Sequence, residues 1–328
     1  MNLITKVELP NYNFKINLQD QLMFIGSCFT ENIGRKFEST FFNVLINPFG
    51  VTYNPISIAD ILQIIMDLTK FGINDVFVHN NLYHSFMHHS SFSCSDINQI
   101  LHKINSNIEF SHNFLKNTNF LFITYGTSIV YTKDNKIVNN CHKLPSSVFL
   151  QKRLSIDEIF DMYKKLIVEL KKFNPKIKII LTVSPVRHLK DGAIENQISK
   201  STLILTSHKI CDFFDDVFYF PSYEIVMDEL RDYRFYAADM FHTNEMAVNY
   251  IWEIICDKII SKSSKSDLPK LQKINDALEH RLFNSNSSEI NSFIVFLEKN
   301  LDYFENKYPK LNYNSVRLKI NELKSFVK

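Results

Sequence analysis

Short apolar runs alternate with amphipathic segments over the first four fifths of the chain. Five runs predict buried strands, at residues 21–25, 43–50, 120–126, 176–185 and 217–222. The segments between them repeat apolar residues at a helical period, most clearly over 154–172. Strands that alternate with helices predict an α/β fold, in which helices cover both faces of a mostly parallel sheet.

The pattern changes near residue 260. The segment 261–267 (SKSSKSD) is small, polar and charged, which is typical of a linker. Beyond it, residues 268–328 are rich in Lys, Asn and Leu and predict two or three amphipathic helices. We therefore expect an α/β domain over 1–260 and a C-terminal helical extension over 261–328.

Composition narrows the class of protein. With 45% hydrophobic and 22% charged residues among 328, the chain is not intrinsically disordered. A formal net charge of +2 gives no global field for nucleic acid or an anionic membrane, so we expect neither as a partner. Five scattered cysteines without a CxxC pair do not form a disulfide framework. The first residues lack the apolar core of a signal peptide, and no apolar run is long enough to span a membrane. We expect a cytoplasmic protein with reduced thiols.

The six glycines exclude several common sites. No GxGxxG, GxxxxGK[ST] or GxSxG motif is present. The absence of these motifs excludes the usual dinucleotide fingerprint, the P-loop and the common nucleophile elbow of α/β-hydrolases. We expect the protein to need no cofactor.

Candidate chemistry lies where the predicted strands end, because ligands of open α/β sheets bind beyond the carboxyl ends of the strands. Ser27 stands between the first strand and a helix. Its N–H and that of Cys28 would favour a developing negative charge at the helix N-terminus. The alternative is that Ser27 only caps the helix.

Asp239 and His242 precede the last helix of the predicted sheet region. A carboxylate three residues before an imidazole can accept from Nδ1–H and leave Nε2 to take a proton. The alternative is a capping aspartate beside an ordinary surface histidine.

Several motifs carry a family resemblance. GSCFTENIG at 26–34 resembles the signature of the GSCFA family, and the serine with the Asp-x-x-His pair resembles the layout of the SGNH (GDSL-like) hydrolase superfamily. The resemblance continues through NPFGVTYNP (47–55), YGTSIVY (125–131), CHKLP (141–145), SPVRHLKDG (184–192), NQISKSTL (196–203) and YRFYAADMFH (233–242). It implies a three-layer αβα fold with a flavodoxin-like sheet of the SGNH type.

The resemblance also implies roles. Ser27 would be the nucleophile, with its own N–H in the oxyanion hole, and Gly50 would give a second N–H donor. His242 would be the base and Asp239 would orient it. The implied activity is that of a serine-dependent esterase or acyltransferase that acts on a small acyl ester, which superfamily habit links to a carbohydrate. The alternative is a weakly active or inactive binding protein on the same frame.

The third sequence block departs from the superfamily pattern. Gly126 is followed by Thr127 and Ser128, where an asparagine is usual. A missing carboxamide donor would cost around 3 kcal/mol of transition-state stabilisation. Thr127, Ser128 or Asn47 remain as alternative donors. The aspartate of the usual GDS motif is absent as well.

Other polar residues are expected to line the same edge and contact a substrate: Arg187, His188, His142, Lys143, Lys200 and His89. Arg187 suits a carboxylate or phosphate, and its alternative is pairing with Asp232 or Glu229. A Cys141–His142 dyad is disfavoured, because adjacent side chains of an extended segment point to opposite faces.

The densest histidine group is His84, His88 and His89. A zinc site is one reading of it, which would make the protein a metal-dependent hydrolase. The cluster holds no Asp, Glu or Cys at diagnostic spacing, so we expect no metal site. The other reading is a loop near the catalytic edge.

Overall fold

The computed structural model describes residues 4–279 and 287–327. Contacts between Cα atoms divide the chain into two compact units. The first takes its residues from Met1–Asn11, Leu22–Gly34 and Leu45–Ile251, and the second from Tyr12–Gln21, Arg35–Val44 and Trp252–Lys328. The expected domain boundary at residue 260 stays a prediction.

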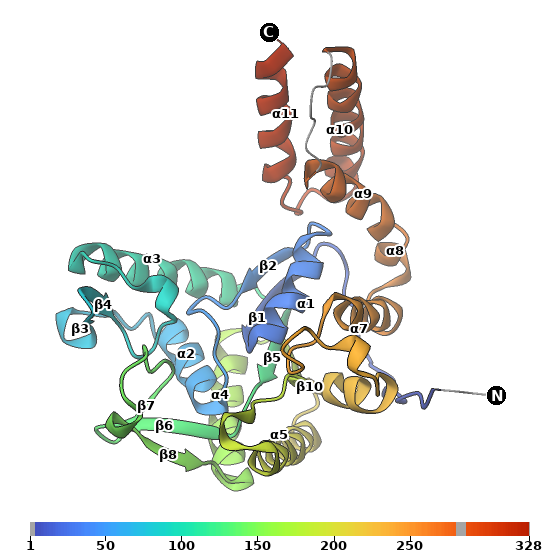
Figure 1. The fold of residues 1–328 in the computed structure, drawn as a ribbon. Helices are drawn as coiled ribbons and strands as arrows, with labels where there is room; N and C mark the ends of the chain where they lie inside the picture. Colours follow the sequence, from blue (N-terminus) through green and yellow to red (C-terminus); the bar gives the residue numbers. More distant parts are fainter. Residues whose placement is uncertain (1–3, 280–286, 328) are drawn as a thin grey trace. The chain divides into compact units, whose positions relative to one another are not determined.

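A five-stranded sheet forms the centre of the fold (Figure 1). Its strands are β1 (Gln21–Gly26), β2 (Asn43–Ile46), β5 (Phe120–Tyr125), β9 (Lys178–Val183) and β10 (Val217–Tyr219). Their order is β10-β9-β5-β1-β2, and β1–β5, β5–β9 and β9–β10 pair in parallel. Counted along the chain this is the order 2-1-3-4-5 of flavodoxin-like sheets. The positions of the five predicted strands are confirmed.

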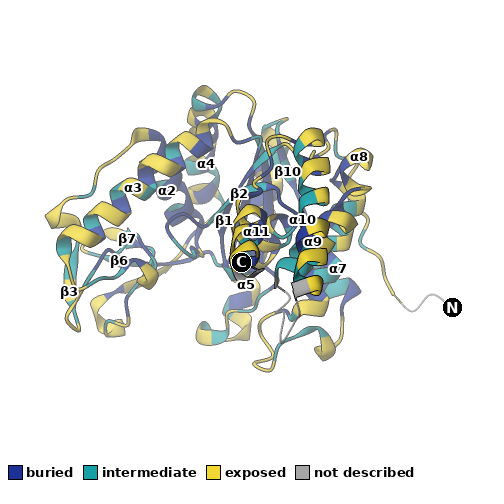
Figure 2. Ribbon diagram, turned by 90° about the horizontal axis from the view of Figure 1, so that it is seen from above, coloured by how far each residue is buried: buried dark blue, intermediate teal, exposed yellow. Residues whose placement is uncertain are grey.

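Helices cover both faces of the sheet (Figures 1 and 2). They are α1 (Cys28–Glu38), α2 (Pro55–Asp67), α3 (Ile97–Lys116), α4 (Ile156–Phe173), α5 (Ala193–Phe213), α6 (Ser222–Glu224) and α7 (Glu245–Lys258). Helix α4 packs against α2 and α5, and α5 packs on β9 and β10. Right-handed crossovers place α1 on the opposite face from this layer. All six residues of β5 are buried, as expected for a parallel strand covered on both sides. The three-layer α/β architecture is therefore confirmed.

The fold also contains two small antiparallel sheets. One pairs β3 (Phe77–His79) with β4 (Leu82–His84), and the other has the order β7-β6-β8. The latter consists of β6 (Ile129–Lys133), β7 (Lys136–Val138) and β8 (Leu150–Arg153). The strands β6 and β7 form a hairpin after β5, and its tip residues Asp134 and Asn135 have φ of 50° and 60°. Left-handed backbone at both positions matches a type I′ turn.

The second unit contains the C-terminal helices. These are α8 (Lys262–Lys265), α9 (Leu268–Glu279), α10 (Ser287–Lys307) and α11 (Asn314–Val327). The segment 261–267, expected as a linker, instead contains α8, capped by Ser261. Asp267 is 3% exposed and accepts from Lys307 Nζ at 2.6 Å and Tyr308 Oη at 2.7 Å. The polar residues of this segment serve caps and ion pairs, which composition alone does not distinguish from a solvated linker. None of the helices in the described ranges combines the length and the apolar composition that crossing a membrane requires.

Candidate functional site

Ser27 lies at the carboxyl end of β1, directly before α1. The preceding Gly26 has φ +147°, and a Cβ there would stand 2.2 Å from Thr124 O. Glycine thus lets β1 and β5 approach closely at their ends. The Ser27 N–H donates to the same Thr124 carbonyl at 3.3 Å. The predicted strand-to-helix junction is confirmed.

The Ser27 side chain is 2% exposed. Its Oγ is buried and makes no hydrogen bond to any described residue. The hydroxyl therefore does not cap α1, as the alternative interpretation required. Buried polar atoms nearly always have a partner, so this hydroxyl is unusual in making no structural hydrogen bond.

Asp239 and His242 form a direct pair. Asp239 Oδ2 lies 2.6 Å from His242 Nδ1, and Oδ1 accepts from the backbone N–H groups of Phe241 and His242. Those two backbone N–H groups and the imidazole lower the pKa of Asp239 to about 2. His242 Nε2 has no partner in the described part of the chain, and the side chain is 52% exposed. This is the orientation in which Nε2 can accept a proton.

The loop that carries this pair reaches the end of β9. The Arg187 N–H donates to Phe241 O at 3.5 Å, so residues 239–242 lie at the carboxyl edge as predicted. In the sheet order, β5 stands between β9 and β1, the strand that ends directly before Ser27. Because Ser27 Oγ has no partner among the described residues, it is not hydrogen-bonded to His242 in this conformation.

The loop after β2 holds two of the expected oxyanion donors. The Gly50 N–H donates to Asn47 O at 2.7 Å within a tight turn. Asn47 Oδ1 accepts from the Gly26 N–H at 2.8 Å, and Nδ2 faces Glu31 Oε1 at 3.5 Å. Asn47 thereby fixes the end of β1, and both expected donors are engaged with protein acceptors.

The polar groups of Thr127 and Ser128, in the loop after β5, also have hydrogen-bond partners within the protein. The N–H groups of Gly126 and Thr127 both donate to Tyr53 O, at 2.7 and 3.0 Å. Ser199 Oγ binds Thr127 Oγ1, the Ser128 N–H and Ser128 Oγ at 2.7–3.1 Å. Thr127 and Ser128 are therefore occupied in this conformation. Ser199 was not predicted.

The first turn of α1 offers backbone donors next to Ser27. Burial raises the pKa of the Cys28 thiol, and the N–H groups of Phe29 and Cys28 oppose this effect. These two N–H groups belong to the helix N-terminus, where intrahelical acceptors are absent. Both N–H groups therefore face the Cys28 sulfur rather than a backbone carbonyl.

Helix α5 presents a buried polar face to the strand ends. Asn196, Ser199 and Lys200 are 3%, 2% and 1% exposed and have the i, i+3, i+4 spacing of one helix face. Lys200 Nζ donates to Gly126 O and Ser184 O, each at 2.7 Å. Burial lowers the pKa of this ammonium to about 7. Lys200 was expected to contact a substrate, which stays a prediction, and the structure buries its side chain.

Arg187 and His188 follow β9. The expected alternative for Arg187, a pair with Asp232 or Glu229, is not formed, because those carboxylates pair with other cations. Arg187 Nη2 contacts Met227 Sδ at 3.3 Å, and no described carboxylate lies within ion-pair distance of it. His188 is partly exposed, and burial lowers its pKa.

The histidine-rich loop packs on the Asn47–Gly50 turn. The His88 ring stacks on Phe49 with centroids 4.3 Å apart, and burial lowers the pKa of His88 to about 3. A Cβ on Gly50 would stand 2.2 Å from His89 Cβ. The loop therefore lies beside the candidate edge. Within the described ranges, no three His, Cys, Asp or Glu side chains are arranged to hold a metal ion.

The segment after β7 contributes less. His142 is 5% exposed, and its ring nitrogens face Ser85 O at 2.7 Å and Ser90 Oγ at 3.3 Å rather than Cys141. Lys143 is exposed. The structure gives neither residue a contact with Ser27 or His242.

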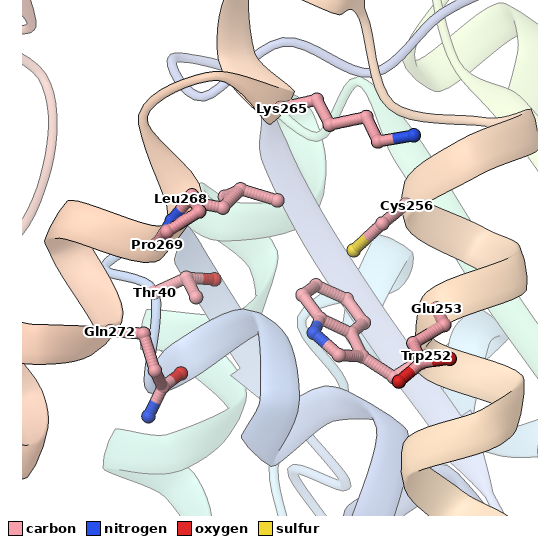
Figure 3. A pocket seen from close by; sticks show the side chains of 8 residues that line it. All are labelled: Thr40, Trp252, Glu253, Cys256, Lys265, Leu268, Pro269 and Gln272. Atoms are coloured by element: carbon pink, nitrogen blue, oxygen red, sulfur yellow. The ribbon is translucent and has the colours of Figure 1, made fainter.

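A separate cavity of about 400 Å³ lies within the second unit (Figure 3). Its lining consists of Thr40, Trp252, Glu253, Cys256, Lys265, Leu268, Pro269 and Gln272. Burial raises the pKa of the Cys256 thiol to about 12, and the Lys265 ammonium pairs with Asp257 at 2.8 Å. The lining therefore holds neither an activated nucleophile nor any of the predicted site residues.

Fold and side chains together define an α/β protein with a serine, an Asp–His pair and a buried lysine at the carboxyl edge of a parallel sheet. The chain belongs to the GSCFA family, whose model matches residues 21–254. This range includes all five strands and both parts of the candidate site. No curated protein matches the chain.

Proposed function

We propose that this protein is a serine-dependent esterase or acyltransferase of the SGNH (GDSL-like) type. Its substrate is an ester of a small acyl group, with a sugar or glycan as the carrier. The catalytic groups are Ser27, His242 and Asp239. The proposal is drawn from the family motifs and from the placement of these groups at one edge of the sheet.

The reaction proceeds through an acyl-enzyme. Ser27 Oγ attacks the ester carbonyl carbon while His242 Nε2 takes the hydroxyl proton. The tetrahedral intermediate then expels the carrier oxygen, which receives that proton from His242. Water or an acceptor hydroxyl next attacks the acyl-serine and gives its proton to His242. The second tetrahedral intermediate expels Ser27 Oγ, which regains that proton from His242 as the acid or the new ester is released.

One observation carries the proposal. Asp239 holds His242 Nδ1 at 2.6 Å and leaves Nε2 without a partner in the described chain, while Ser27 Oγ, at the same edge of the sheet, has none either. The reaction requires these two atoms to come within about 2.6–3.2 Å, a contact that many enzymes complete only with substrate bound. The Ser27 and Gly50 N–H groups would first have to leave Thr124 O and Asn47 O to serve as oxyanion donors.

A fluorophosphonate probe tests the proposal. Such a probe phosphonylates only a serine that a base activates, so we expect covalent labelling at Ser27, located by peptide mass spectrometry. Ser27→Ala should abolish the labelled peptide and His242→Ala should reduce labelling by at least ~10²-fold. Ser207→Ala, which changes a buried hydroxyl bonded to Leu203 O, is the matched control. Absence of label on the unmodified protein refutes the enzymatic role.

A binding protein on the same frame is the second candidate. It is favoured by the burial of Ser27 and by the engagement of Gly50, Thr127 and Ser128 with protein partners. A ligand that stabilises the chain in thermal unfolding while Ser27 remains unlabelled would support this candidate. Labelling that depends on His242 would exclude it.

A further inference from the structure

The buried polar face of α5 has two hydrogen-bond donors without acceptors. Lys200 uses two of the three N–H groups of its ammonium, on Gly126 O and Ser184 O, and the third has no acceptor among the described residues. One helical turn earlier, Asn196 Oδ1 accepts from the His188 N–H at 2.9 Å, which fixes the orientation of the amide. Asn196 Nδ2 is then buried with no partner in the described chain. Both vacant donors call for an acceptor atom.

The charges at this place are also unbalanced. The Lys200 ammonium and the Arg187 guanidinium are close enough to repel each other. Neither has a carboxylate within ion-pair distance among the described residues. A buried cation without a counter-ion is costly, and buried groups with perturbed pKa values cluster at functional sites. An anion would supply both the missing acceptor and the missing opposite charge.

The Lys200 ammonium lies beside the candidate site, and Asn196 is one helical turn from Lys200. Lys200 binds the carbonyl of Gly126, two residues beyond Thr124, whose own carbonyl accepts the Ser27 N–H. Two strand residues span only about 6.6 Å. The ammonium also interacts electrostatically with the Cys28 thiol, next to Ser27 in the chain.

We propose that Lys200 and Asn196 form a subsite for a tetrahedral oxyanion, held by the third Lys200 N–H and by Asn196 Nδ2–H. The subsite supplies the carboxamide and positive charge for which the third block, Gly126-Thr127-Ser128, has no donor. This inference rests on the proposed function, since the oxyanion that forms during ester cleavage is the anion concerned. It assigns the two residues a role that the family motif alone does not.

Inorganic phosphate, a stable tetrahedral oxyanion, probes the subsite without requiring catalysis. Binding to the folded chain alone raises the unfolding temperature with phosphate concentration. We expect this rise in the unmodified protein, at ionic strength held constant with chloride. Lys200→Met keeps an unbranched side chain only one atom shorter, removes its charge, and should abolish the rise.

Two further variants separate the subsite from general effects. Lys209→Met changes an exposed lysine of the same helix, paired with Asp157 at 2.6 Å, and should keep the full phosphate response. Asn196→Asp retains the acceptor for His188 N–H but places a carboxylate one turn from Lys200. It should raise the unfolding temperature without phosphate, because Lys200 gains a counter-ion, and should abolish the phosphate response. This variant decides the matter even if Lys200→Met does not fold.

Fluorophosphonate labelling of the same variants separates this inference from the proposed function. Loss of the phosphate response together with a ~10²-fold or greater loss of Ser27 labelling in Lys200→Met and Asn196→Asp supports both. If phosphate stabilises the protein through these two residues but the probe never labels Ser27, the subsite is supported and the esterase proposal is refuted. Labelling and phosphate responses that are equal in all variants refute the subsite and leave the esterase standing.

Discussion

His242 owes its orientation to a single neighbouring carboxylate. Asp239 accepts from two backbone N–H groups and faces the imidazole Nδ1. These contacts hold the pKa of the Asp239 carboxyl at about 2. It therefore stays ionised at every pH at which the protein is expected to work, and fixes the proton on Nδ1. The pair lies within four residues of sequence, which is why the sequence alone sufficed to predict it.

Replacement of Asp239 by asparagine tests this orientation. The amide can donate to Nδ1 and so favours the wrong imidazole tautomer, which in a serine protease costs about 10⁴-fold in turnover. We expect a fall of at least ~10²-fold in Ser27 labelling by fluorophosphonate. The unfolding temperature should stay within a few degrees, because the side chain is exposed. Unchanged labelling would contradict the role of Asp239.

Gly50 combines a positive φ with a close neighbour. Its φ is +82°, and a Cβ would stand 2.2 Å from His89 Cβ. Gly192 has a similar φ of +90° but nothing within 4 Å, so it serves as the matched control. We expect Gly192→Ala to cost about 1 kcal/mol of unfolding free energy through backbone strain alone. Gly50→Ala should cost about 1–3 kcal/mol more through overpacking, measured by urea denaturation. Equal losses of unfolding free energy in the two variants would show that the loop around His89 moves to accommodate the added methyl group at no cost.

At the scale of elements, helix ends followed the sequence closely. Helix α4 begins with a reciprocal capping box, in which Ser155 Oγ accepts from the Glu158 N–H at 3.2 Å and Glu158 Oε2 accepts from the Ser155 N–H at 2.8 Å. Helix α5, by contrast, does not sort its residues into an apolar buried face and a polar exposed face. Its polar residues Asn196 and Lys200 are buried, while Ile194 and Leu205 are 77% and 57% exposed. The period of apolar residues alone cannot predict the orientation of a helix that buries polar side chains and exposes apolar ones.

The cap of α4 gives a prediction at this scale. Ser155→Ala removes the acceptor for the Glu158 N–H and should lower the free energy of unfolding by about 1 kcal/mol. Ser155→Asp keeps an acceptor at the N-cap and should restore most of that loss. Urea denaturation followed by circular dichroism measures both. An alanine variant as stable as the parent would mean that α4 is held by packing alone.

At the scale of the whole molecule, the buried ammonium of Lys200 couples stability to pH. Burial lowers its folded-state pKa to about 7, below the value of about 10.4 in an unfolded chain. Between these values the unfolded chain binds one more proton, so the free energy of unfolding gains a positive slope with pH. Below pH 7 both states are protonated and the contribution is constant. Among the groups that face Lys200, a charged Cys28 favours the ammonium and Arg187 disfavours it, and His188 also interacts with Lys200.

Lys200→Met removes this slope. We expect the stability of the parent relative to the variant to be constant below pH 7 and to rise between about pH 7 and 10. Taking the difference between the two proteins cancels the titration of unaltered groups. Lys209→Met, with an exposed and paired side chain, should show no such rise. Urea denaturation over this pH range gives the result, and a flat difference would refute the buried-cation account.

The sequence by itself determined the elements, their order and the chemistry within single motifs. Apolar period, caps and glycines act over a few residues, so they predict five parallel strands, the Ser27 junction and the Asp239–His242 pair. Only the tertiary structure decided what depends on distant partners. It buried Lys200 against Gly126 and Ser184, occupied the expected oxyanion donors, and formed the short helix α8 within the polar segment 261–267. Burial and hydrogen-bond satisfaction are properties of the neighbours that folding supplies, and those neighbours lie tens to hundreds of residues away.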